Sequence, residues 1–95
     1  MSKQQYRSEL GTISDIMYAT MEGGKSGTII STICRMANLS HHAATEKCQH
    51  LLDVGLIEQL SSEQNRIFAI TEKGIRFYQE LQQFKENIQE IKIRF

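Results

Sequence analysis

Residues 37–58 read ANLSHHAATEKCQHLLDVGLIE, and the architecture can be worked out from them in both directions along the chain. Ser40 is a favourable helix N-cap, because its hydroxyl can accept a hydrogen bond from a free backbone amide of the first turn. The helix is predicted to cover residues 41–54 and to end at Gly55, a residue type that suits the position after a helix. Its apolar residues recur on one face: Ala44, Cys48, Leu51 and Leu52.

Two more helices are predicted upstream, joined to this one by residues 37–39. Residues 8–21 carry apolar side chains three and four positions apart, and Gly23-Gly24 then ends the helix. Residues 28–36 are rich in β-branched side chains, which also suit a strand. A helical spacing of apolar residues favours the helix there: Ile29, Ile33 and Met36.

Downstream of Gly55 the pattern changes to short apolar runs. Residues 56–60 and 66–70 are predicted strands, joined by the polar loop 61–65 into a hairpin. Thr71 is the predicted N-cap of a last helix that runs to the chain end. This helix carries apolar residues at alternating spacings of four and three, the pattern of a coiled coil: Phe77, Leu81, Phe84, Ile88, Ile91 and Phe95.

This order of elements predicts an α+β, mostly helical fold, a winged helix-turn-helix of three helices and a β-hairpin wing with a long C-terminal helix. Residues 1–71 would form the winged helix-turn-helix domain and residues 72–95 a dimerisation helix, in one continuous unit. Ile75 and Tyr78 can pack on the domain. Four residues of the stripe would project beyond it, and a second copy of the helix would bury them: Phe84, Ile88, Ile91 and Phe95. The alternative is a helix that folds back on its own domain.

Length and charge limit the possible functions. The chain has 95 residues, which suits one small domain, and its 11 Lys and Arg balance 11 Asp and Glu. This balance excludes a strongly basic protein that coats nucleic acid by charge alone. Two cysteines, an N-terminus without an apolar leader and the lack of a membrane-spanning run point to the cytoplasm.

Several short motifs carry a family resemblance: Gly23-Gly24, Ala37-Asn38-Leu39-Ser40, Leu51-Leu52-Asp53-Val54-Gly55-Leu56-Ile57-Glu58 and Ile70-Thr71-Glu72-Lys73-Gly74. From about residue 8 onward the chain resembles the small archaeal winged-helix DNA-binding proteins, which are regulators and chromatin-associated proteins. The resemblance implies that the helix at 41–54 enters the major groove. It also implies a homodimer whose last helices pair as a coiled coil, usually antiparallel. The charges beside the stripe do not favour either orientation. Family members tend to carry several basic residues early in the recognition helix, whereas residues 41–47 here read HHAATEK.

Double-stranded DNA is therefore the expected partner, read by the outward face of the helix at 41–54. Gln49 can pair with adenine, Thr45 can meet a thymine methyl group or a phosphate, and Glu46 can accept from cytosine. The full set of predicted DNA-contacting residues is Ser40, His41, His42, Thr45, Glu46, Gln49, Lys25, Arg35, Gln64, Asn65 and Arg66. Glu46 and Asp53 on the same face favour the alternative of a protein-interaction module that has lost DNA binding.

The sequence gives no reason to expect an enzyme, a metal or a cofactor. Histidine and cysteine are suitable zinc ligands, but Cys48 and His50 point in different directions from one helix and cannot share an ion. His41 and His42 are adjacent and diverge. Cys34 and Cys48 both fall on predicted helices, where a free cysteine acts as a small buried hydrophobic residue.

Overall fold

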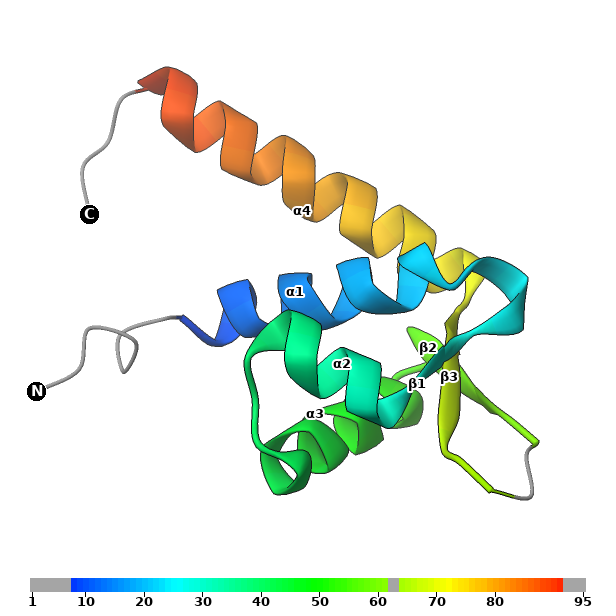
Figure 1. The fold of residues 1–95 in the computed structure, drawn as a ribbon. Helices are drawn as coiled ribbons and strands as arrows, with labels where there is room; N and C mark the ends of the chain where they lie inside the picture. Colours follow the sequence, from blue (N-terminus) through cyan, green and yellow to red (C-terminus); the bar gives the residue numbers. More distant parts are fainter. Residues whose placement is uncertain (1–7, 62–63, 92–95) are drawn as a thin grey trace, which may run out of the picture.

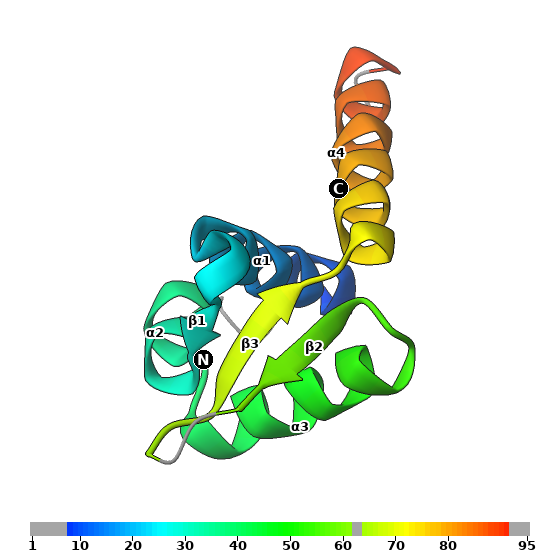
Figure 2. The same ribbon diagram turned by 90° about the vertical axis from the view of Figure 1, so that its right-hand side faces the viewer.

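The computed structural model describes residues 8–61 and 64–91. In chain order its elements are α1 (Glu9–Glu22), η2 (Gly24–Ser26), β1 (Thr28–Ile29), α2 (Ile30–Ala37), α3 (His41–Asp53), β2 (Ile57–Leu60), β3 (Ile67–Ile70) and α4 (Glu72–Ile91). The first three helices pack together on one side of the sheet (Figure 1), and the β2–β3 hairpin extends as the wing (Figure 2). The predicted winged helix fold is confirmed, and most element ends fall within one residue of the prediction.

The prediction of one helix over residues 28–36 is wrong at its start. Thr28 and Ile29 form β1 and pair antiparallel with Phe68 and Ile67 of β3. The hairpin is therefore part of a three-stranded sheet in the order β1-β3-β2. The helix begins only at Ile30, two residues later than predicted. β-branched side chains suit an extended backbone, and the partner strand that makes it favourable comes from much later in the chain.

The turn between α2 and α3 is short and well defined. Asn38 has a φ of 56°, in the left-handed region, and ends α2. Ala37, predicted to lie in the connection, is instead the fully buried last residue of α2. The Ser40 hydroxyl accepts a hydrogen bond from the Ala43 amide at 3.1 Å, which confirms the predicted N-cap. These two features fix where α3 starts.

The core lies where the three packed helices meet the sheet. Its most deeply buried large side chains include Ile16 and Met17 of α1, Ile33 of α2, Cys48 of α3 and Ile57 of β2. The predicted apolar face of α3 is buried as expected at Ala44, Cys48 and Leu51, and Leu52 is half-buried. The opposite face of α3 consequently remains in solvent.

The start of α4 is held tightly against the domain. The Thr71 hydroxyl accepts from the Gly74 amide at 3.0 Å, as predicted for an N-cap. The Lys73 ammonium donates to the Val54 carbonyl at 2.7 Å, which ties α4 to the end of α3. Gly74 is buried here, and a Cβ added to it would lie 2.1 Å from the Leu56 carbonyl oxygen.

The first half of α4 runs along α1, and its second half extends away from the domain (Figure 1). The buried Ser14 hydroxyl of α1 donates to Gln82 Oε1 at 3.5 Å and accepts from Lys85 Nζ at 3.1 Å. Leu81 is buried by the chain's own residues. As far as Lys85 the helix is therefore part of the domain rather than a free arm.

The apolar stripe of α4 divides between the core and the surface. Phe77 and Tyr78 are half-buried against the core, as expected for Tyr78, whereas Ile75 is 37% exposed and does not pack as predicted. Further along the helix Phe84 is 54% exposed and Ile88 is half-buried. The side chain of Ile91 and all of Phe95 lie outside the described residues. Of the stripe residues whose side chains are described, Phe84 is therefore the most open to a second copy.

Of the helices that the structure describes, none has the length and apolar character needed to cross a membrane.

Candidate nucleic-acid interface

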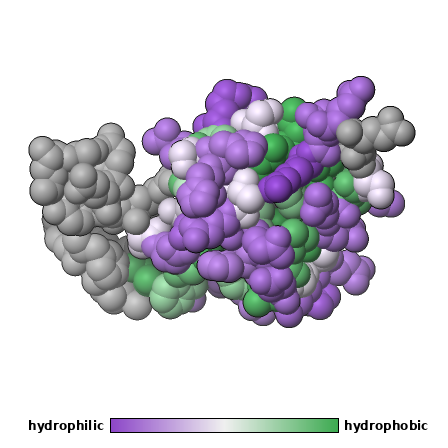
Figure 3. Space-filling model, turned by 90° about the horizontal axis from the view of Figure 1, so that it is seen from below, coloured by the Kyte–Doolittle hydropathy of each residue, from purple (hydrophilic) through white to green (hydrophobic). Residues whose placement is uncertain are grey.

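The outward face of α3 is polar and open to solvent. His41, His42, Glu46, Gln49 and His50 are all exposed, and Asp53 extends the same face toward the end of the helix. Seen from the side of α3, the surface is mostly hydrophilic with small apolar areas between the polar ones (Figure 3). The structure thus brings together the residues predicted for the recognition helix on one accessible surface.

Gln49 and Asp53 are joined within this face. The Gln49 side-chain amide donates to Asp53 Oδ1 at 3.0 Å, one helical turn further on. An amide group carries two donor hydrogens and an acceptor oxygen, so this bond leaves one hydrogen and the oxygen available. Asp53 therefore holds the Gln49 side chain in one orientation and does not use up its hydrogen-bonding capacity.

Ser40 and Thr45 differ from the rest of the predicted set. The Ser40 oxygen already accepts the capping hydrogen bond, and its residue is exposed at the start of α3. Thr45 is half-buried on the flank of the helix, and its hydroxyl oxygen is covered and has no hydrogen-bond partner among the described residues. Ser40 can still donate to an approaching phosphate, whereas the Thr45 hydroxyl is not presented to solvent in this conformation.

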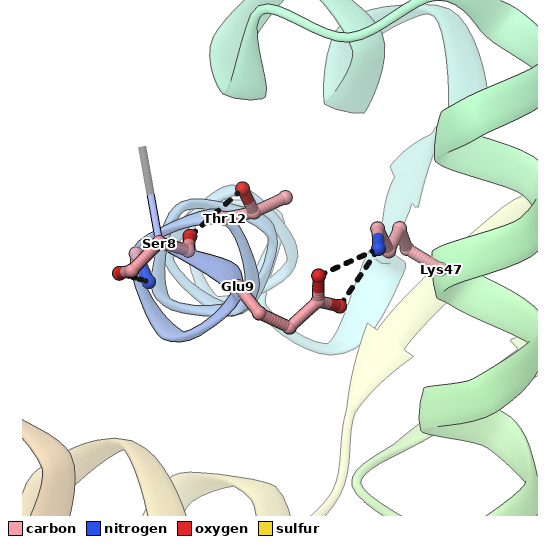
Figure 4. Close-up of polar contacts among 5 residues, drawn as sticks. Ser8, Glu9, Thr12 and Lys47 are labelled. Atoms are coloured by element: carbon pink, nitrogen blue, oxygen red, sulfur yellow. Dashed lines mark hydrogen bonds and ion pairs between the residues drawn. The ribbon is translucent and has the colours of Figure 1, made fainter. Parts of the chain in front are cut away.

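Lys47, the basic residue of α3, is held by a carboxylate of α1. Its ammonium lies 2.7 Å and 2.9 Å from the two carboxylate oxygens of Glu9 (Figure 4). Glu9 follows the N-cap Ser8, whose hydroxyl accepts from the Gly11 amide, so the first turn of α1 fixes the carboxylate's position. The pair spans 38 residues of sequence, and no local pattern indicated it. It neutralises the one Lys of α3, a helix that contains no Arg.

The other predicted basic contacts lie on different sides of the molecule. Arg35 is exposed in the last turn of α2, and Arg66 is exposed at the end of the hairpin loop. The hairpin loop, with Gln64 and Asn65 exposed, reaches downward on the same side as α3 (Figure 1). Lys25 is in η2, which Figure 1 shows in cyan above the sheet, away from α3. Lys25 is therefore not brought together with the rest of the predicted set.

A metal site is not assembled by the described residues. Among residues 8–61 and 64–91, no group of three His, Cys, Asp or Glu side chains is placed to hold an ion. Cys34 and Cys48 are both free thiols, the first half-buried and the second buried. Burial raises the pKa of the Cys48 thiol to about 11, with a smaller contribution from Cys34.

This difference in burial predicts selective thiol chemistry. In the native protein at pH 8, iodoacetamide is expected to modify Cys34 and to leave Cys48 unmodified, because the reactive species is the thiolate. Mass spectrometry of the labelled protein, before and after unfolding in guanidinium chloride, measures this directly. The Cys34→Ser variant provides the control and should be labelled only after unfolding. Rapid native labelling of Cys48 in that variant would contradict the burial of its thiol.

Comparison with known proteins places this geometry among related folds. The sequence profile of the winged helix-turn-helix family matches residues 6–89. The fold is similar to that of Sso10a-2, a DNA-binding protein from Sulfolobus solfataricus, with a TM-score of 0.74, 21% identity and 90% of each chain covered. It is also similar to AF1382 from Archaeoglobus fulgidus, with a TM-score of 0.67, 17% identity, and 98% of this chain and 100% of the other covered.

A larger regulator shares the fold over part of its length. MepR, a transcription regulator of a multidrug efflux pump in Staphylococcus aureus, has a TM-score of 0.72 at 12% identity. The match covers 94% of this chain and 65% of MepR. A search by sequence among curated proteins finds no match.

Proposed function

This chain belongs to the winged helix-turn-helix family, and we propose that it binds double-stranded DNA selectively by sequence, as a transcription regulator or an architectural protein. One observation carries the proposal: α3 buries its apolar face in the core and leaves a continuous polar face in solvent. An α-helix presented in this way fits the major groove of B-DNA. The structural similarity to DNA-binding regulators supports the same conclusion.

Within the groove, Gln49 and His42 are the residues that we expect to contact base edges. The free hydrogen and oxygen of the Gln49 amide match the N7 and N6 groups of adenine. Its bond to Asp53 holds it in place before DNA arrives, which lowers the entropy lost on binding. His42 is exposed in the first turn of α3 and can donate to a base acceptor or a phosphate.

Phosphate contacts are expected to be few. Lys47 is paired with Glu9, and Lys25 lies away from α3, so Arg35 on α2 and Arg66 on the wing are the cations of the predicted contact set that remain for phosphates. Each neutralised phosphate adds about 0.9 to the slope of log K against log salt concentration. We therefore expect a shallow salt dependence, with sequence contacts responsible for a large share of the affinity.

We propose a homodimer that pairs through the second half of α4. Phe84 is a large apolar side chain that is more than half exposed, and Ile88 follows it one turn later. The same helix of a second copy would cover both. The antiparallel orientation is the one that the resemblance to small archaeal winged-helix proteins implies, and it would place the two α3 helices at opposite ends of the dimer.

The double variant His42→Ala, Gln49→Ala tests the base contacts. We expect its affinity for a selected duplex to fall by about tenfold or more, because one good bidentate contact contributes roughly 1–3 kcal/mol. Fluorescence anisotropy with a labelled duplex measures the loss. The matched control is Gln79→Ala, Gln83→Ala, two exposed polar residues of α4, which should retain the affinity.

The duplex itself comes from selection out of a random pool at low and at physiological salt. Enrichment of one sequence at both salt concentrations supports a sequence reader, and recovery of unrelated duplexes only at low salt indicates a coating protein. Exposed Glu46 and Asp53 favour the second candidate function, a protein-interaction module on a winged-helix scaffold. If the folded protein binds no duplex at low salt, the DNA-binding proposal is wrong and that second candidate stands.

A further inference from the structure

A groove of about 330 Å³ lies between the end of α1, β1 and α2. Its walls include Ala19 and Glu22 of α1, Ile29 of β1, and Thr32 and Met36 of α2. The volume is at the lower end of the range for pockets that hold small organic molecules. Arg35 is not among the lining residues, but it stands three positions after Thr32 and is therefore its neighbour on the surface of α2.

The backbone around Gly23 and Gly27 gives the groove a fixed base. A Cβ added to Gly23 would lie 2.2 Å from the Gly27 carbonyl oxygen, so the two glycines approach as closely as backbone allows. The adjacent Thr28 is buried, and its hydroxyl donates to the Ala19 carbonyl at 2.8 Å. The base is therefore formed by tightly packed backbone and does not depend on mobile side chains.

The chemistry of the walls is mixed, with one charge. Ile29 and Met36 are half-buried apolar side chains that remain partly open to the groove, and Thr32 offers a hydroxyl. Glu22 is the one ionisable group among the lining residues. Its carboxylate also raises the pKa of the neighbouring Tyr18, first through its charge and then through a hydrogen bond. The negative charge at the groove therefore acts on the neutral phenol of Tyr18 beside it.

We propose that this groove binds a small organic cation with an apolar body, of the arylalkylammonium type. Its ammonium would pair with the Glu22 carboxylate and donate to the Thr32 hydroxyl, and its apolar body would cover Ile29 and Met36. Such a ligand pairs with the charge of the groove and also covers its apolar walls, whereas the carboxylate would repel an anion. The ligand would contact α2, the first helix of the helix-turn-helix, and the site exists whether or not the protein binds DNA.

The test is an NMR titration of the full chain with 2-phenylethylammonium at pH 7. We expect saturable shifts confined to amides of residues 19–36. Two analogues of similar shape separate charge from apolar contact: neutral 2-phenylethanol and anionic 3-phenylpropanoate. Both should bind more weakly than the cation, the anion most weakly.

Variants assign the contacts. Glu22→Gln should weaken binding of the cation by about threefold to fivefold, as expected for a partly exposed ion pair. The variant should then bind the cation and the neutral analogue with equal affinity. Thr32→Val keeps the side-chain shape but removes the hydroxyl, and it should also weaken binding of the cation. Glu86→Gln, an exposed acid of α4, is the matched control and should leave binding unchanged.

Each remaining outcome overturns the proposal. Equal affinity for the three compounds would mean that the charge of Glu22 selects nothing. Shifts centred elsewhere on the protein would place the site outside the groove. If binding does not saturate up to about 10 mM ligand, a concentration above the dissociation constants of weak specific sites, there is no site. Thermal melting of each variant confirms that it is folded when it is measured.

Discussion

Replacing Gly74 by alanine is expected to destabilise the domain by about 2–3 kcal/mol. The new Cβ would lie 2.1 Å from the Leu56 carbonyl oxygen, 2.8 Å from Ile70 Cγ1 and 3.0 Å from Met17 Cε. The carbonyl is held in place because it also accepts from the Thr71 amide at 3.2 Å. The helix start would have to move away from β2, and the capping contacts of Thr71 and Lys73 would be weakened with it.

Helix propensity alone predicts the opposite sign for the change in stability. Alanine in place of glycine normally stabilises a helix by roughly 0.5–1 kcal/mol. Here the overlap with backbone is the larger effect, so the sign is reversed. Thermal unfolding followed by circular dichroism should show a lower Tm by about 10–20 °C, since 1 kcal/mol corresponds to roughly 4–8 °C in a domain of this size.

The control for this substitution is Gln79→Ala, at an exposed position of the same helix. It should change the stability by less than about 0.5 kcal/mol. An increase in Tm for Gly74→Ala would show that α4 does not approach β2 as closely as described here.

Replacing Phe84 by lysine is expected to convert the proposed homodimer into monomers. Covering the exposed half of such a side chain contributes about half of the roughly 1.5–3 kcal/mol of full burial, a symmetric dimer contains it twice, and an ammonium placed there adds its own desolvation cost. The dissociation constant should therefore rise by about 10²–10⁴. Because Phe84 is 54% exposed in the single chain, the substitution should leave the fold of each subunit intact. Sedimentation equilibrium over a range of concentrations measures the change.

Gln83→Lys is the matched control for charge. It adds the same ammonium at the neighbouring exposed position, and the dimer should persist. Circular dichroism of Phe84→Lys should match the unsubstituted protein in shape. A Phe84→Lys protein that stays dimeric with unaltered affinity would exclude this part of α4 as the interface.

Much of the fold could be predicted because its signals are local. The caps at Ser40 and Thr71 depend on a hydroxyl and an amide three residues away, and both hydrogen bonds are present in the structure. The apolar face of α3 follows from the geometry of one helix, and the same periodicity leaves Gln49 and His42 on the solvent side. This exposed polar face is therefore largely encoded within residues 40–53.

Other features depend on contacts between distant parts of the chain. The sequence indicated that residues 28–29 can be extended, but pairing with β3 makes them a strand. Lys47 is the basic residue of α3, and its partner Glu9 comes from α1, 38 residues earlier in the chain. The stripe on α4 is periodic throughout. Its division into a buried Leu81 and an exposed Phe84 depends on where the contact between α1 and α4 ends.

The sequence by itself determined the order of the α-helices and of the two hairpin strands, the caps at Ser40 and Thr71 and the polar face of α3, because each depends on residues within a few positions of one another. The tertiary structure decided three things: that β1 joins the sheet, that Glu9 neutralises Lys47, and that Leu81 of the stripe is buried while Phe84 stays exposed. The physical reason is that each of these requires two segments to meet in space, and local preferences are too weak to specify such a meeting.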